Sequence, residues 1–103
     1  MMKPGKPVHP SNGAGLAPDA AANPSGIEVS FDGGPNRNRQ AASMVVVTNL
    51  EAAQYLEISF DEGRDWFTIA FNTTMHFPVV IHRVRLRGRV GATARYSILG
   101  IVS

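Results

Sequence analysis

The sequence contains no cysteine and no run of 18 apolar residues. The missing cysteines exclude disulfide bonds and thiolate metal ligands. The missing apolar run excludes a membrane-spanning helix, and we expect no membrane partner. Lys3 and Lys6 are not followed by an apolar stretch, so we expect no secretory signal peptide.

Motifs of catalysis are also missing. The chain has no nucleophile motif, no phosphate-binding loop and no dinucleotide fingerprint. Asp61, Glu62 and Asp65 make only part of a calcium loop. The three histidines, His9, His76 and His82, share no metal-ligand spacing. We expect His82 to lie in the core. We therefore predict a protein that is not an enzyme and holds no cofactor or metal.

What is present fits one small domain. The chain has 103 residues, of which 44% are hydrophobic and 17% charged. A domain of this size buries about two thirds of its unfolded surface, so its stability margin is small. We therefore expect a homo-oligomer.

Residues 1–25 differ in composition from the rest. Five of the seven prolines lie here, and beyond the first two methionines the large apolar residues are only Val8 and Leu16. Such a segment has no core of its own. We predict an extended N-terminal arm over residues 1–25 that becomes ordered against another chain, with Lys3, Lys6, Val8 and Leu16 at the interface.

From residue 26 onward, apolar and polar residues alternate with period two, as in half-buried strands. Short strands at this spacing predict an all-β fold, a small antiparallel β-sandwich or barrel over residues 26–103. The second strand, rich in valine, is expected to be buried on both faces. The six predicted strands are Ile27–Phe31, Ser43–Leu50, Tyr55–Phe60, Trp66–Phe71, Val79–Arg89 and Arg95–Val102.

A strand-turn motif occurs twice, at residues 27–34 and 56–63. Each copy runs into a turn in which an Asp side chain can cap backbone N–H groups and a Gly supplies positive φ. The second copy, with Ser59 and Trp66, resembles the Asp box, which in other families is a folding element of a hairpin. We predict structural turns at Asp32, Gly34, Asp61, Gly63 and Trp66.

The predicted strand at 79–89 carries alternate arginines, at Arg83, Arg85, Arg87 and Arg89. Strand geometry places them on one face, roughly 6.5–7 Å apart. They could pair across strands with Glu28, Glu51 or Glu57, form a protein interface, or bind nucleic acid. We do not expect nucleic acid binding, because a single stripe of arginine gives a narrow basic surface.

The block from 45 to 102 resembles small β-sandwich proteins of tailed bacteriophage virions. The segments that carry the resemblance are VVVTNL (45–50), YLEISFDEGRDWFTI (55–69), VVIHRVRLRG (79–88) and ARYSILGIV (94–102). The resemblance implies a non-enzymatic virion protein whose partner is the major capsid protein or another virion protein. Capsid decoration (cement) proteins of this kind combine a compact β domain with an arm that reaches over neighbouring subunits.

Two other functions remain open. Proteins of the phage tail or of the head-tail connector have the same anatomy. A carbohydrate-binding module would use Trp66, Tyr55 and Tyr96 as stacking platforms for sugars.

Overall fold

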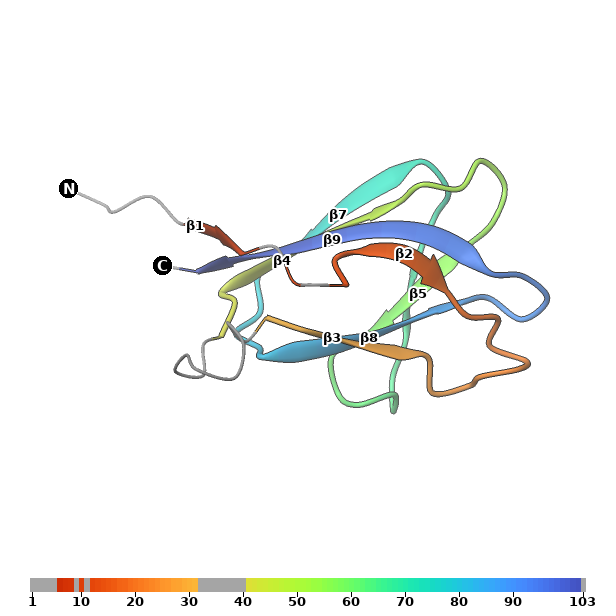
Figure 1. The fold of residues 1–103 in the computed structure, drawn as a ribbon, viewed down its shortest axis with the longest axis horizontal. Coiled ribbons are helices and arrows are strands. Elements are labelled where there is room, and N and C mark those ends of the chain that lie inside the picture. Colours follow the sequence, from red (N-terminus) through yellow and green to blue (C-terminus); the bar gives the residue numbers. More distant parts are fainter. Residues whose placement is uncertain (1–5, 9, 11, 32–40, 103) are drawn as a thin grey trace.

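Two antiparallel β-sheets pack face to face in the computed structural model (Figure 1), which describes residues 6–8, 10, 12–31 and 41–102. Sheet A has the order β1-β9-β4-β7, and β2 also pairs with β9. Sheet B has the order β3-β8-β5-β6. The predicted all-β antiparallel sandwich is therefore confirmed. The strands are β1 (Lys6–Val8), β2 (Ala14–Ala17), β3 (Ile27–Ser30), β4 (Met44–Asn49), β5 (Leu56–Ser59), β6 (Phe67–Ile69), β7 (Thr73–Phe77), β8 (Arg83–Gly88) and β9 (Ala94–Val102).

The core lies between the two sheets and is built from alternate residues of the central strands. In β4, Val45 and Val47 are fully buried while Val46 is half-buried. The expectation that this strand is buried on both faces is therefore wrong, because no described part of the chain covers the outer side of sheet A. Sheet B contributes the largest aliphatic side chains, and each buried Leu or Ile contributes about 1.5–3 kcal/mol relative to exposure. They are Leu56, Ile58, Ile69 and Leu86.

The predicted strands are found with shifted ends. The strand expected at 79–89 begins only at Arg83, because Ile81 still bridges to Ala42 beside sheet A before the chain crosses to sheet B. The strand expected at 66–71 covers only Phe67–Ile69, and both Phe67 and Phe71 are exposed. β7 follows in a region where no strand was predicted.

The third predicted strand, at 55–60, departs from the alternation of buried and exposed residues at its end. Strict alternation after the buried Ile58 would turn Ser59 outward, yet Ser59 is fully buried and Phe60 is only partly so. The Ser59 hydroxyl is used inside the turn that follows, which draws the side chain inward.

The N-terminal segment lies against its own chain. β1 and β2 follow one another along β9, from the pair Lys6↔Val102 to the pair Ala17↔Ala94. The Tyr96 hydroxyl donates a 2.7 Å hydrogen bond to the carbonyl oxygen of Asn12. The segment is extended, as expected, but the expectation that it needs the surface of another chain is wrong for the described residues.

Backbone pairing explains why the composition of residues 1–25 led to a wrong expectation. A strand can satisfy its N–H and C=O groups on the edge of β9 without large apolar side chains. Small residues suffice for the remaining packing, since Ala17 and Ala20 are buried. Leu16, by contrast, is 61% exposed.

The part of the chain that the structure describes contains no helix long and apolar enough to cross a membrane.

Candidate functional site

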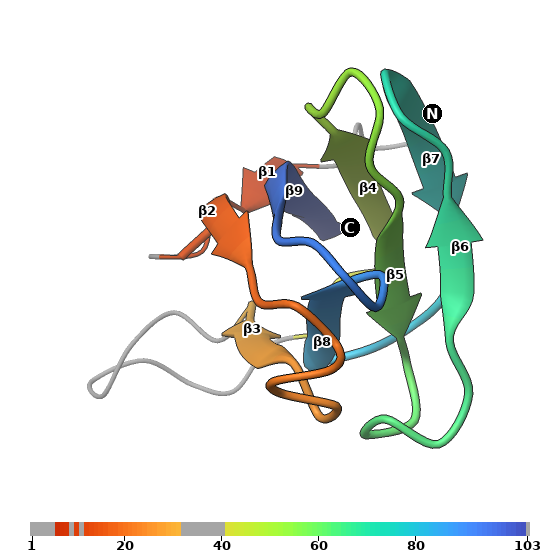
Figure 2. The same cartoon turned by 90° about the vertical axis from the view of Figure 1, so that its right-hand side faces the viewer.

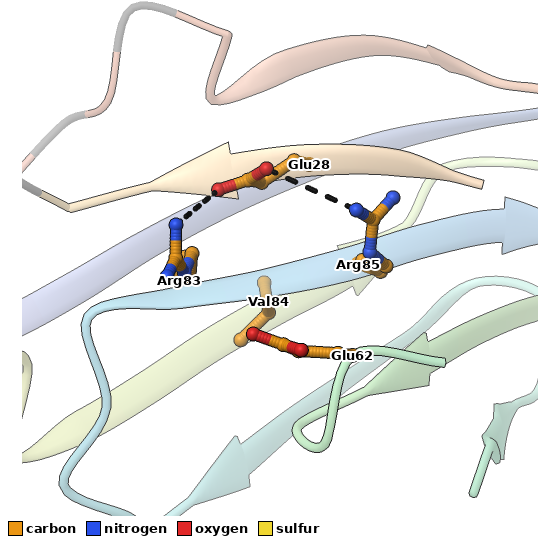
Figure 3. Close-up of a pocket in the computed structure, with 5 residues that line it drawn as sticks. All are labelled: Glu28, Glu62, Arg83, Val84 and Arg85. Atoms are coloured by element: carbon orange, nitrogen blue, oxygen red, sulfur yellow. Dashed lines mark hydrogen bonds and ion pairs between the residues drawn. The ribbon is translucent and has the colours of Figure 1, made fainter. Parts of the chain in front are cut away.

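The arginines of β8 lie on the outer face of sheet B, where the register places carboxylates opposite them. Glu28 of β3 is directly opposite Arg85, and Glu57 of β5 is directly opposite Arg87. Glu28 contacts Arg83 at 3.3 Å and Arg85 at 4.0 Å (Figure 3). Of the three interpretations of the arginine stripe, the geometry favours cross-strand pairing.

The last two arginines also contact aromatic rings. The Arg87 side chain donates to Glu57 at 2.8 Å and its guanidinium lies 4.0 Å from the centroid of the Trp66 ring. The guanidinium of Arg89 lies 4.9 Å from the centroid of the Tyr55 ring, beyond the end of β8. Each of the four arginines thus has a carboxylate or a ring as partner, which leaves less charge available to phosphates.

Glu51, the third carboxylate considered for this stripe, lies elsewhere. It accepts from the backbone N–H and the side chain of Arg95 at 2.9 and 3.2 Å. These contacts, led by the backbone hydrogen bond, lower the pKa of the Glu51 carboxyl. Glu51 therefore ties the loop after β4 to β9 rather than to β8.

A small cavity of about 140 Å³ opens on the arginine face. Figure 3 shows the Glu62 side chain on the opposite side of β8 from Glu28, with Arg83 and Arg85 directed toward Glu28. The cavity could hold only a few water molecules. Its lining residues are Glu28, Glu62, Arg83, Val84 and Arg85. Because the two arginines are already paired with Glu28, the cavity is a hollow between ion pairs.

The turn between β5 and β6 is held by side-chain hydrogen bonds. The Ser59 hydroxyl donates to Asp61 Oδ1 at 2.8 Å and accepts from the Gly63 N–H at 2.8 Å. Asp61 Oδ1 also accepts from the Asp65 N–H at 2.9 Å, and this contact first, with Ser59 second, lowers the pKa of the Asp61 carboxyl. The Trp66 indole N–H closes the turn on the Gly63 carbonyl oxygen at 3.0 Å. The other predicted turn residues, Asp32 and Gly34, lie outside the described residues.

The three aromatic residues considered as sugar platforms do not share a surface. Tyr96 is 1% exposed and its hydroxyl is bound to Asn12. Trp66 is half-buried under Arg87, and Tyr55 packs edge-on against Phe71. A sugar ring stacks on an aromatic ring with an open face, and these three rings do not form such a surface together.

The histidines are also dispersed. His76 is exposed on β7, and His82 is half-buried ahead of β8, not in the core as expected, while His9 lies outside the described residues. Within the described residues, no three side chains of His, Asp or Glu gather into a metal site. Of the remaining predicted interface residues, Lys3 lies outside the described residues, and Lys6 and Val8 lie in β1.

The most distinctive surface feature was not found from the sequence. Among the described residues, seven large hydrophobic side chains are exposed, and four of them lie between residues 66 and 82: Phe67, Phe71, Met75 and Val80. Phe67 lies in β6 and Met75 in β7, two strands that run along one side of the sandwich (Figure 2), while Phe71 and Val80 lie in the segments before and after β7. We call residues 66–82 the uncharged edge, because they contain no Asp, Glu, Lys or Arg. That uninterrupted lack of charge is the signal that sequence analysis could have used.

Aromatic rings join the two sheets at this edge. Phe77 of β7 lies 4.9 Å from the ring centroid of Phe60 and 6.1 Å from that of Phe67 in β6. Such tilted ring pairs add about 0.5–1.5 kcal/mol each beyond their burial. The cluster covers only part of this side of the core, and Phe67 remains 52% exposed.

No family model, curated protein or solved structure matches the chain.

Proposed function

We propose that the chain is a non-enzymatic structural protein of a tailed-phage virion, most similar in role to a capsid decoration protein. The observation that carries the proposal is the uncharged edge, which contains four of the seven large hydrophobic side chains that are exposed among the described residues. Exposed apolar surface on a small protein favours contact with another protein. The resemblance of residues 45–102 to virion β-sandwich proteins suggests that this other protein belongs to a phage virion.

The proposal no longer depends on an arm. Because β1 and β2 pair with β9 of the same chain, the N-terminal segment is part of the sandwich. Contact with the capsid is therefore assigned to the uncharged edge, and repetition over a shell would supply avidity that a single small contact lacks. A role in the tail or the connector would use the same edge against a different virion protein.

Two exposed valines allow a matched test. Val80 is 80% exposed within the uncharged edge, and Val90 is 72% exposed between β8 and β9. Purified wild-type protein should sediment with empty phage capsids, Val80→Lys should bind at least tenfold more weakly, and Val90→Lys should bind as the wild type does. Absence of wild-type binding to capsids, tails and connectors alike would refute a virion role.

A further inference from the structure

We propose that two copies of the chain associate through β7, which pairs antiparallel with β7 of the second copy and joins the two copies of sheet A. This inference names the first partner of the uncharged edge and so deepens the proposed function. It begins from the open side of β7, which is the last strand of sheet A. Among the described strands, β7 pairs only with β4.

The other described sheet edges are shorter or protected. β6 has only three residues. β3 carries Glu28, a charged side chain that discourages pairing with a foreign strand. On the other side of sheet A, β1 and β2 cover β9 and form the edge themselves, with only three and four residues. β7, with five residues and neither a formal charge nor a proline, has none of the usual protections.

The strand is compatible with a copy of itself. A two-fold axis pairs identical strands antiparallel, so each residue faces its symmetry counterpart across the axis. With the axis at Met75, Thr74 faces His76 of the second copy, and no formal charges face one another anywhere along the strand. The exposed face of sheet B, with its arginines and glutamates, lies outside this contact.

Apolar surface beside β7 gives the pairing its driving force. Met75 is opposite Val47, whose side chain faces the core, yet Met75 is 37% exposed because sheet B ends at the short β6. Phe67 of β6 is exposed beside the same opening. A second copy on β7 would extend sheet A over this open end and remove both side chains from water.

His76→Lys tests the pairing directly. His76 lies opposite Val46 on the outer side of sheet A, and its exposed side chain makes no hydrogen bond or ion pair with any described residue, so the substitution should leave the monomer folded. Leu16→Lys is the matched control, because Leu16 is 61% exposed on β2 at the opposite edge of the same sheet. The full-length wild type should show twice the 11.1 kDa chain mass by light scattering. His76→Lys should show the chain mass alone, and Leu16→Lys should show the dimer.

Amide hydrogen exchange supplies a second measurement. In the wild type, alternate amides of residues 73–77 should become protected as protein concentration rises, since only every second N–H points to the new strand. A wild type that stays monomeric at high concentration would overturn the proposal. A dimer that His76→Lys leaves intact, or concentration-dependent protection that lies outside β7, would also overturn it.

Failure of the dimer and failure of the virion role are distinguishable. A monomer that sediments with capsids in a Val80-dependent way would refute the β7 pairing alone. A dimer that binds no virion component would refute the virion role alone.

Discussion

Replacing Tyr96 by Phe tests whether the N-terminal segment is docked on its own domain. The substitution removes one hydroxyl from a ring that is 1% exposed and deletes its 2.7 Å hydrogen bond to the carbonyl oxygen of Asn12. A hydrogen bond of this kind contributes about 0.5–1.5 kcal/mol net. We expect Tyr96→Phe to lower the free energy of unfolding by about 1 kcal/mol, or the melting temperature by about 4–8 °C for a domain of this size.

Tyr55→Phe is the matched control. The Tyr55 hydroxyl makes no hydrogen bond with any described residue, while its ring contacts Phe71 and Arg89, which Phe would also contact. Both variants should be measured by urea unfolding at neutral pH, and Tyr55→Phe should change the unfolding free energy very little. Equal effects of the two substitutions would mean that the segment before β3 is not held as described.

Alkaline pH adds a second comparison for the same variant. Burial raises the pKa of the Tyr96 hydroxyl above its ordinary value of 10.0. A raised pKa means that the stabilisation by the neutral hydroxyl is complete below about pH 10 and is lost as pH rises through the folded-state pKa. The stability advantage of the wild type over Tyr96→Phe should therefore shrink above pH 10. An advantage that stays constant to higher pH would contradict burial of this hydroxyl.

Three further substitutions test local features of the sandwich. Glu62 has a φ of 64°, where a Cβ atom is strained, so Glu62→Gly should raise the unfolding free energy by about 1 kcal/mol, and a loss of stability would contradict this account. Hydrogen bonds lower the pKa of the Asp61 carboxyl below 3.8. The stability that its ionised form contributes is therefore present above that pH and is lost as the pH falls through the folded-state pKa. Asp61→Asn should flatten the acid limb of a curve of unfolding free energy against pH. Gly100→Ala would place a Cβ 2.8 Å from the Phe31 ring and should destabilise by about 1–3 kcal/mol, as measured by thermal unfolding, whereas a neutral result would mean a looser core.

Period-two alternation was enough to predict the sandwich, because burial on one face imposes it on each strand. β4 and β9 were found from their β-branched residues with each end within one residue of the prediction. β7 was missed because its five residues show no such alternation: Thr73 and Phe77 are half-buried and the three residues between them are exposed. A strand at an open end of the core leaves little trace in hydrophobic pattern.

The N-terminal segment failed as a prediction for a different reason. Its composition describes side chains, whereas its placement depends on pairing with backbone groups of β9. Those groups lie nearly eighty residues further along the sequence, or more. The arginine stripe shows the same limit. Its spacing predicted one shared face, but the choice of Glu28 and Glu57 over Glu51 follows from the strand order β3-β8-β5, which a single sequence does not reveal.

The two sides of sheet A differ: β1 and β2 cover β9 on one side, whereas no described strand covers β7 on the other. This difference connects the N-terminal segment to the uncharged edge. β9 is the longest strand, and its outer side would expose nine residues of backbone if β1 and β2 did not cover it. An open edge of that length invites pairing with any other strand. The segment that precedes β3 therefore replaces the long edge of β9 with two shorter edges, of three residues in β1 and four in β2. Association through β7 alone gives a closed pair, whereas a second long edge would allow continuous growth of the sheet. On this reasoning the N-terminal segment does not reach for a neighbour but restricts where a neighbour can bind.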